Sequence, residues 1–78
     1  MLSSIAYHLT PASIGAKQKI DESITQINVE LACSKTGYCE RSGLFKGISW
    51  SVIGRKEVDG PSFIRVICSD VDIMRSYA

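Results

Sequence analysis

Residues 10–33, TPASIGAKQKIDESITQINVELAC, decide the fold because they carry the strongest periodic pattern in the chain. Thr10 is a favourable N-cap, and proline suits the next position because its missing N–H would have no partner there. Isoleucine and leucine then recur at steps of four, three and four residues, from Ile20 to Leu31, which lines one face of a helix. The stretch predicts one long amphipathic helix from about residue 11 to 33.

A strand is the competing interpretation of the end of this stretch. Ile27, Val29, Leu31 and Cys33 alternate with other residues at the period of a half-buried strand. The helical pattern has more apolar anchors and a cap behind it, so we expect helix at 27–33, with Gly37 positioned to stop it.

Strand patterns begin at residue 44. Ile48, Trp50 and Val52 alternate with serines, residues 63–68 are rich in β-favouring types, and Asp59-Gly60-Pro61 supplies a turn between them. Ser69 is a candidate N-cap for a short final helix. The prediction is a single α+β domain over residues 1–78: one long amphipathic helix packed on a small antiparallel sheet with a C-terminal hairpin, and a short C-terminal helix.

The last predicted strand is apolar on both faces. Ile64, Val66 and Cys68 point one way, and Phe63, Arg65 and Ile67 point the other way. One helix covers only one face of a sheet. We therefore expect the second face to meet the N-terminal segment 5–9, the C-terminal residues, or another copy of the chain.

Composition excludes several classes of protein. The chain has 78 residues, of which 45% are hydrophobic and 22% charged, with a formal net charge of +1. These values fit a small globular domain, and they exclude a disordered chain and a strongly basic nucleic-acid binder. The N-terminus lacks the features of a secretory signal and no stretch is apolar enough to span a bilayer, so we expect a cytoplasmic protein without membrane contact.

The stretch CSKTGYCERSG, residues 33–43, contains two of the three cysteines. Its spacing matches neither a zinc knuckle nor a C-x-x-C redox pair, and the other candidate zinc ligands are only Cys68 and His8. We expect free thiols, with Cys33 and Cys68 as small buried residues and Cys39 exposed, and no metal or cofactor. The stretch then serves as a locally basic connection between helix and hairpin.

Catalytic motifs are not evident. His8 is the sole histidine, so any histidine-activated nucleophile would depend on it, and Asp70 and Asp72 are explained as helix-capping acids rather than as magnesium ligands. The triplet Lys35-Thr36-Gly37 lacks the S-x-x-K pair of serine β-lactamases, and no phosphate-binding glycine motif occurs. We predict no catalytic residues and no enzymatic activity.

Two functional hypotheses remain. The first is a small non-catalytic interaction or regulatory module that acts through protein–protein contacts as a homodimer. The alternative is a single-stranded nucleic-acid-binding domain that uses segment 35–56, because residues 33–56 contain five cationic side chains against one acid, with Tyr38 and Phe45 available for stacking. The predicted partner-binding residues are Lys35, Tyr38, Arg41, Phe45, Lys46, Phe63 and Arg65.

Overall fold

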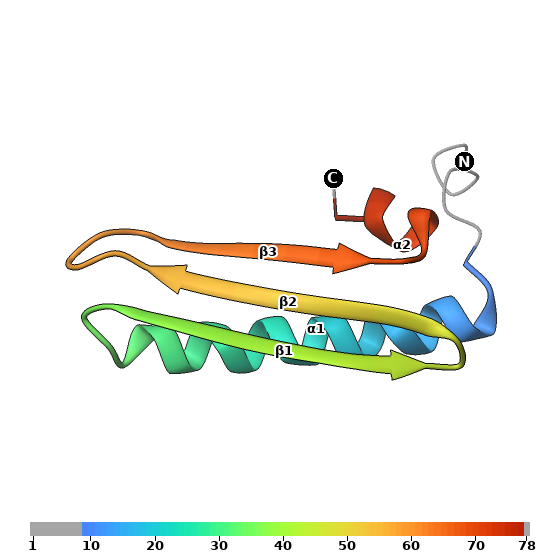
Figure 1. Cartoon of the computed structure of the whole chain (residues 1–78), viewed down its shortest axis with the longest axis horizontal. Helices are drawn as coiled ribbons and strands as arrows, with labels where there is room; N and C mark the ends of the chain where they lie inside the picture. The colour runs from blue at the N-terminus through green and yellow to red at the C-terminus, as the bar shows by residue number, and fades with distance from the viewer. Residues whose placement is uncertain (1–8, 78) are drawn as a thin grey trace, which may run out of the picture.

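The computed structural model describes residues 9–77 and confirms the α+β prediction. A long helix is followed by three strands and a short helix, namely α1 (Pro11–Ala32), β1 (Gly37–Phe45), β2 (Ile48–Lys56), β3 (Ser62–Cys68) and α2 (Val71–Arg75). The strands form one antiparallel sheet in the order β1-β2-β3, and α1 runs along its full length (Figure 1).

Helix α1 begins where the sequence predicts. The Oγ1 atom of Thr10 accepts a hydrogen bond of 3.1 Å from the Ser13 N–H, which satisfies one of the free donors of the first turn. The helix continues through Ile27 and Leu31, which are both buried, so the strand interpretation of 27–33 is wrong. The helix ends at Ala32 with Cys33 as its C-cap, and Gly37 does not stop it.

Strand β1 corrects the expectation that residues 33–43 are only a connection. Gly37 pairs with Lys56 at one end of the β1–β2 ladder and Phe45 pairs with Ile48 at the other. The two strands are joined at Lys46 and Gly47, which both have positive φ (49° and 86°), as a two-residue hairpin turn requires. The predicted hairpin of β2 and β3 is also present, so the sheet consists of two consecutive hairpins.

The core lies between α1 and the face of the sheet turned towards it. Gly54 lets the helix approach closely, because a Cβ atom at this position would lie 2.2 Å from Cγ2 of Ile27 and 2.9 Å from Cδ1 of Leu31. Val52 is fully buried on the same face of β2. Trp50 lies on this face as well, but it is only half-buried, and its Nε1 atom is enclosed without a hydrogen-bond partner in residues 9–77.

Helix α2 closes one end of this core. Its Ile73 is fully buried, and its N-cap is Asp70 rather than the predicted Ser69. The Asp70 carboxylate accepts hydrogen bonds from the N–H groups of Asp72 and Ile73. The Ser69 hydroxyl instead accepts a hydrogen bond from the Ser49 N–H. The predicted short C-terminal helix is thus confirmed, and it packs beside α1 and β3.

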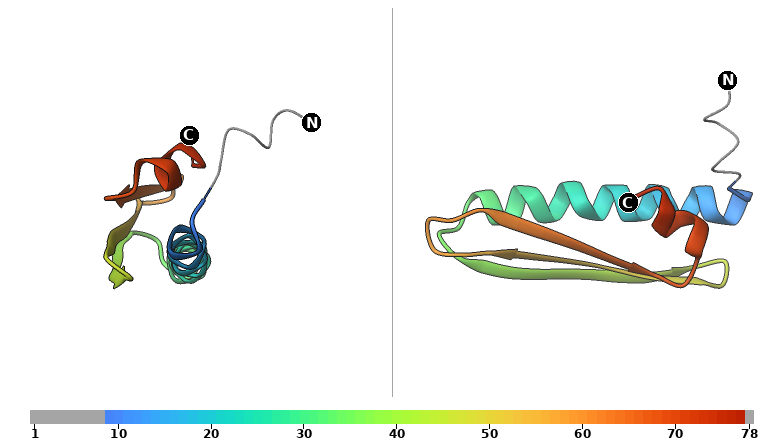
Figure 2. Two further views of the ribbon diagram at one scale, coloured as in Figure 1. Left: turned by 90° about the vertical axis from the view of Figure 1, so that its right-hand side faces the viewer. Right: turned by 90° about the horizontal axis from the view of Figure 1, so that it is seen from above.

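The end-on view shows that α1 runs along one face of the sheet and that α2 lies near the β3 edge (Figure 2). Within residues 9–77, no helix or strand covers the opposite face. The C-terminal residues are therefore not its cover, because Ile73 of α2 belongs to the core. Of the predicted N-terminal cover, Leu9 packs against the core and residues 5–8 lie outside the described residues.

Candidate functional site

The candidate site is the sheet face that points away from α1, which we call the outer face. Strand geometry sends alternate side chains to this face, and the register aligns them in rows across the three strands. From β1 to β3, the rows are Tyr38, Arg55 and Phe63; Glu40, Ile53 and Arg65; and Ser42, Ser51 and Ile67.

Large apolar side chains on the outer face are open to solvent. Tyr38 is 63% exposed, Phe63 57%, Ile67 45% and Leu44 72%. Ile53 lies half-buried between them at the centre of the sheet. Single exposed apolar residues are common, but a group of them on one face is typical of an interaction surface.

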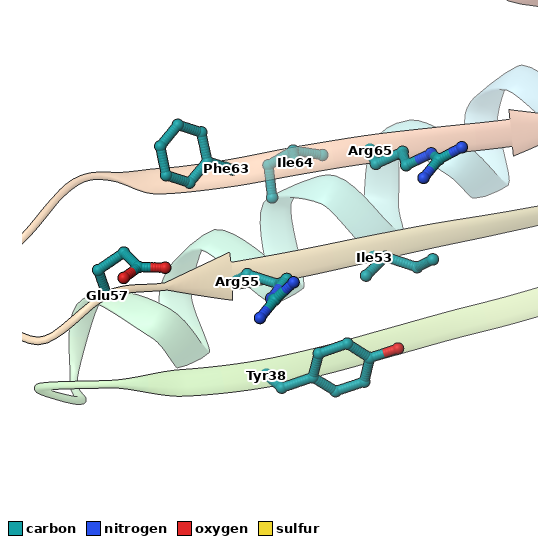
Figure 3. Close-up of a pocket in the computed structure, with 7 residues that line it drawn as sticks. All are labelled: Tyr38, Ile53, Arg55, Glu57, Phe63, Ile64 and Arg65. Carbon is teal, nitrogen blue, oxygen red and sulfur yellow. The ribbon is translucent and has the colours of Figure 1, made fainter.

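A shallow hollow of about 460 Å³ lies at the Tyr38 end of the outer face. Figure 3 shows Tyr38, Arg55 and Phe63 side by side across the three strands, with Glu57 beyond them where β2 ends. Arginine and aromatic residues are the types that most often dominate the energy of protein–protein interfaces. The hollow therefore has the composition of a binding centre.

The charges of the outer face balance. Arg55 and Arg65 are matched by Glu40 on β1 and by Glu57 at the rim of the hollow. The Tyr38 hydroxyl donates a hydrogen bond of 3.2 Å to Oε1 of Glu40, and this bond raises the pKa of the phenol above its ordinary value. Tyr38 is thus neutral at physiological pH, and the face combines aromatic groups with equal numbers of opposite charges.

The predicted partner-binding residues are divided by the fold. Tyr38, Phe63 and Arg65 lie together on the outer face, whereas Arg41 and Phe45 point towards α1. Arg41 forms an ion pair with Glu30 of the helix, and a Cβ atom on Gly15 would clash with the ring of Phe45. Lys35 and Lys46 lie in the loops at opposite ends of β1, so residues 35–46 do not form one surface.

Sequence reasoning missed Glu40, Ile53 and Arg55 as members of this face. Side chains of a strand alternate between its two faces, and Trp50 and Val52 point inward. The alternation in the sequence therefore indicates that Ile53 and Arg55 point outward. For Glu40 the sequence carries no such signal, because residues 37–45 do not show a strand pattern of their own. Its place beside Ile53 follows only from the β1–β2 register.

A second cluster of polar groups joins β1 to α1. The buried Cys39 thiol donates a hydrogen bond of 2.9 Å to Oε1 of Glu30, and Nη1 of Arg41 lies 3.3 Å from the sulfur. This bond to Glu30 and burial raise the pKa of Cys39, so the thiol stays protonated and is a poor nucleophile. The expectation of an exposed Cys39 and a buried Cys33 is wrong: Cys39 is buried and Cys33 is exposed.

All three cysteines are free thiols, and residues 9–77 hold no group of three side chains arranged to bind a metal ion. His8 lies outside the described residues. Asp70 is occupied by its capping bonds and by Ser13, whose hydrogen bond is the main reason that the pKa of the carboxyl is lowered. No helix in this part of the chain is long and apolar enough to cross a membrane.

Comparison with protein-family models found no match, and no curated protein or solved structure matched the chain.

Proposed function

We propose that the protein is a small non-catalytic interaction module whose outer face binds another protein, and that this partner is a second copy of the chain. The observation that carries the proposal is the exposed, charge-balanced face with Tyr38, Arg55 and Phe63 across its three strands. Two sheets that pack face to face would bury these apolar side chains between them, as in a β-sandwich.

Charge balance favours a second copy over many other partners. A symmetric dimer brings identical surfaces together, so a face with a large net charge would repel itself. The outer face instead offers Arg55 and Arg65 with Glu40 and Glu57, and it can supply both partners of an ion pair.

The size of the face limits the area that a face-to-face dimer can bury. Three strands of this length, at standard strand spacing, present about 400 Å² of flat area per copy. Two copies would cover about 800 Å² of flat area in total, which is below the roughly 1,200–2,000 Å² that standard specific interfaces bury, so we expect a weak, reversible dimer with a dissociation constant in the micromolar range.

Single-stranded nucleic acid is the less favoured partner. Phosphate binding needs an excess of cations along one path, but Arg41 is paired with Glu30, and Lys35 and Lys46 lie at opposite ends of β1. The predicted stacking residues Tyr38 and Phe45 also point to opposite faces of the sheet. The cations and aromatics of segment 35–56 thus do not make one platform.

Sedimentation velocity across the micromolar range tests the proposal. We expect a concentration-dependent dimer for the natural chain and a monomer for Phe63→Ser, because this change removes an exposed aromatic group from the proposed interface. Val29→Ser is the matched control, since Val29 is 61% exposed on α1, away from the outer face. It should dimerise like the natural chain, and circular dichroism should show that both variants are folded.

A natural chain that stays monomeric across this range contradicts the dimer. Loss of the dimer in Val29→Ser but not in Phe63→Ser would place the interface on the helix instead. Fluorescence anisotropy with a mixed pool of single-stranded oligonucleotides addresses the alternative. Tight binding that falls steeply with salt and is lost in Phe63→Ser would assign the face to nucleic acid.

A further inference from the structure

The middle row of the outer face carries opposite charges on its two sides. Ile53 of β2 pairs with Glu40 of β1 on one side and with Arg65 of β3 on the other. Neighbouring strands are about 4.8 Å apart, so the acidic and basic residues lie at nearly equal distances from β2. A half-turn about an axis parallel to β2 therefore exchanges the positions of the acidic residue and the basic residue.

We propose, on the basis of the proposed function, that two copies pack face to face about a two-fold axis parallel to β2, with Glu40 of each copy paired with Arg65 of the other. A half-turn about this axis places β1 of one copy over β3 of its partner. It brings Ile53 against the second Ile53 at the centre. The two ion pairs then lie on either side of this apolar contact.

The same rotation is consistent with the neighbouring row. Tyr38 on β1 comes to lie over Phe63 on β3 of the second copy, which forms two aromatic contacts. Arg55 lies on β2 like Ile53, so the two Arg55 side chains face each other across the axis and form the one pair of like charges in this row. Glu57 lines the same hollow as Arg55, and each copy thus brings a carboxylate to this end of the interface.

The charge pattern disfavours the other face-to-face arrangement. A two-fold axis across the strands at this row would place Glu40 over Glu40 and Arg65 over Arg65. Like charges brought together in a desolvated interface repel each other strongly. The row of Glu40, Ile53 and Arg65 therefore selects the axis parallel to β2.

The two charged groups are available for this contact. Within residues 9–77, Arg65 forms no ion pair, and it is exposed. Glu40 accepts hydrogen bonds from the hydroxyl groups of Tyr38 (3.2 Å) and Ser51 (3.4 Å). A carboxylate has about four acceptor sites, so these bonds orient Glu40 and leave sites for an arginine.

A charge-exchange experiment tests the arrangement. Glu40→Arg alone places arginine opposite arginine at both contacts, and Arg65→Glu alone places glutamate opposite glutamate. We expect each change to raise the dimer dissociation constant more than about tenfold. An equimolar mixture of the two variants should form a heterodimer, because each contact then joins an arginine to a glutamate. The double variant E40R/R65E should form a homodimer again.

Two matched controls change the same charges elsewhere. Glu22→Arg and Lys19→Glu alter exposed side chains of α1, and both should dimerise like the natural chain. Sedimentation velocity measures the assemblies, and native mass spectrometry identifies the heterodimer by its mass.

The outcomes separate this proposal from the proposed function. If the natural chain dimerises and both single variants keep its affinity, this arrangement is overturned but the dimer is not. Pairing along the β1 or β3 edge would then be the geometry to examine. Single variants that lose the dimer without recovery in the mixture or in E40R/R65E also overturn it. A natural chain that is monomeric overturns both proposals, and a dimer that forms only after residues 1–8 are deleted would assign that segment as the natural cover of the face.

Discussion

The Ser13 hydroxyl donates a hydrogen bond of 2.6 Å to Oδ2 of Asp70 and so joins the first turn of α1 to the residue that caps α2. Ser13 is only 2% exposed, and its own N–H is bonded to Thr10. The two helix N-termini are thus held together through two caps that share one hydrogen-bond network.

Loss of this network should destabilise the protein in a pH-dependent way. Asp70→Ala removes the cap and leaves the buried Ser13 hydroxyl without its acceptor, which we expect to lower the free energy of unfolding by about 1–3 kcal/mol near neutral pH. Because the pKa of Asp70 is lowered in the folded state, its contribution is complete above the unfolded-state pKa of about 3.9 and is lost as the pH falls through the folded-state pKa.

Urea unfolding of the natural chain and Asp70→Ala, at neutral and at acidic pH, measures this difference. The gap between the two should shrink in acid. Asp72→Ala is the matched control, because Asp72 is exposed in the first turn of α2, and it should change stability by less than about 0.5 kcal/mol. A gap that stays constant or grows in acid would contradict the role given to the Asp70 carboxylate.

Gly54→Ala should be strongly destabilising although it adds a single methyl group. The new Cβ would lie 2.2 Å from Ile27 and 2.9 Å from Leu31, so α1 would have to move away from β2. We expect a loss of about 1–3 kcal/mol in the free energy of unfolding, the usual cost of overpacking a core. Ser49→Ala, at an exposed position of the same strand, should be nearly neutral in the same urea titration.

A double-mutant cycle with Ile27→Ala isolates this contact. Removal of the Ile27 side chain makes room for the new methyl group, so the two changes together should cost clearly less than the sum of their separate effects. Strict additivity would show that the close approach at Gly54 does not set the distance between helix and sheet.

The helix was predictable because its signals are local. Thr10 and Pro11 begin it, and the apolar residues from Ile20 to Leu31 recur at helical spacing within one segment of the chain. β1 was not predictable in this way. Glycines at 37 and 43 and polar residues between them favour loops, and their strand conformation depends on pairing with β2 and on packing beneath α1.

The same difference explains which part of the outer face could be found. Phe63 and Arg65 are predictable because alternation within β3 is visible in its own sequence. Glu40 is not predictable in this way, because its place opposite Ile53 depends on the register, which the turn at Lys46 and Gly47 determines. The site is formed by pairing between segments, and a pattern within one segment does not show it.

The three cysteines should differ sharply in their reaction with a thiol-specific alkylating reagent. Cys33 is exposed at the end of α1 and should react first in the native protein. Cys39 is 9% exposed, and its pKa is raised, chiefly by its hydrogen bond to Glu30, so little reactive thiolate should be present near neutral pH. Mass spectrometry of peptides after timed alkylation measures each site separately.

Glu30→Gln provides the control for this explanation. The amide keeps the shape of the side chain but removes the negative charge that disfavours the Cys39 thiolate, and Arg41 then remains beside the sulfur. Cys39 should therefore react faster in Glu30→Gln than in the natural chain, while Cys33 should react at an unchanged rate. Equal acceleration at both sites would indicate general unfolding, and no acceleration at Cys39 would show that burial alone protects it.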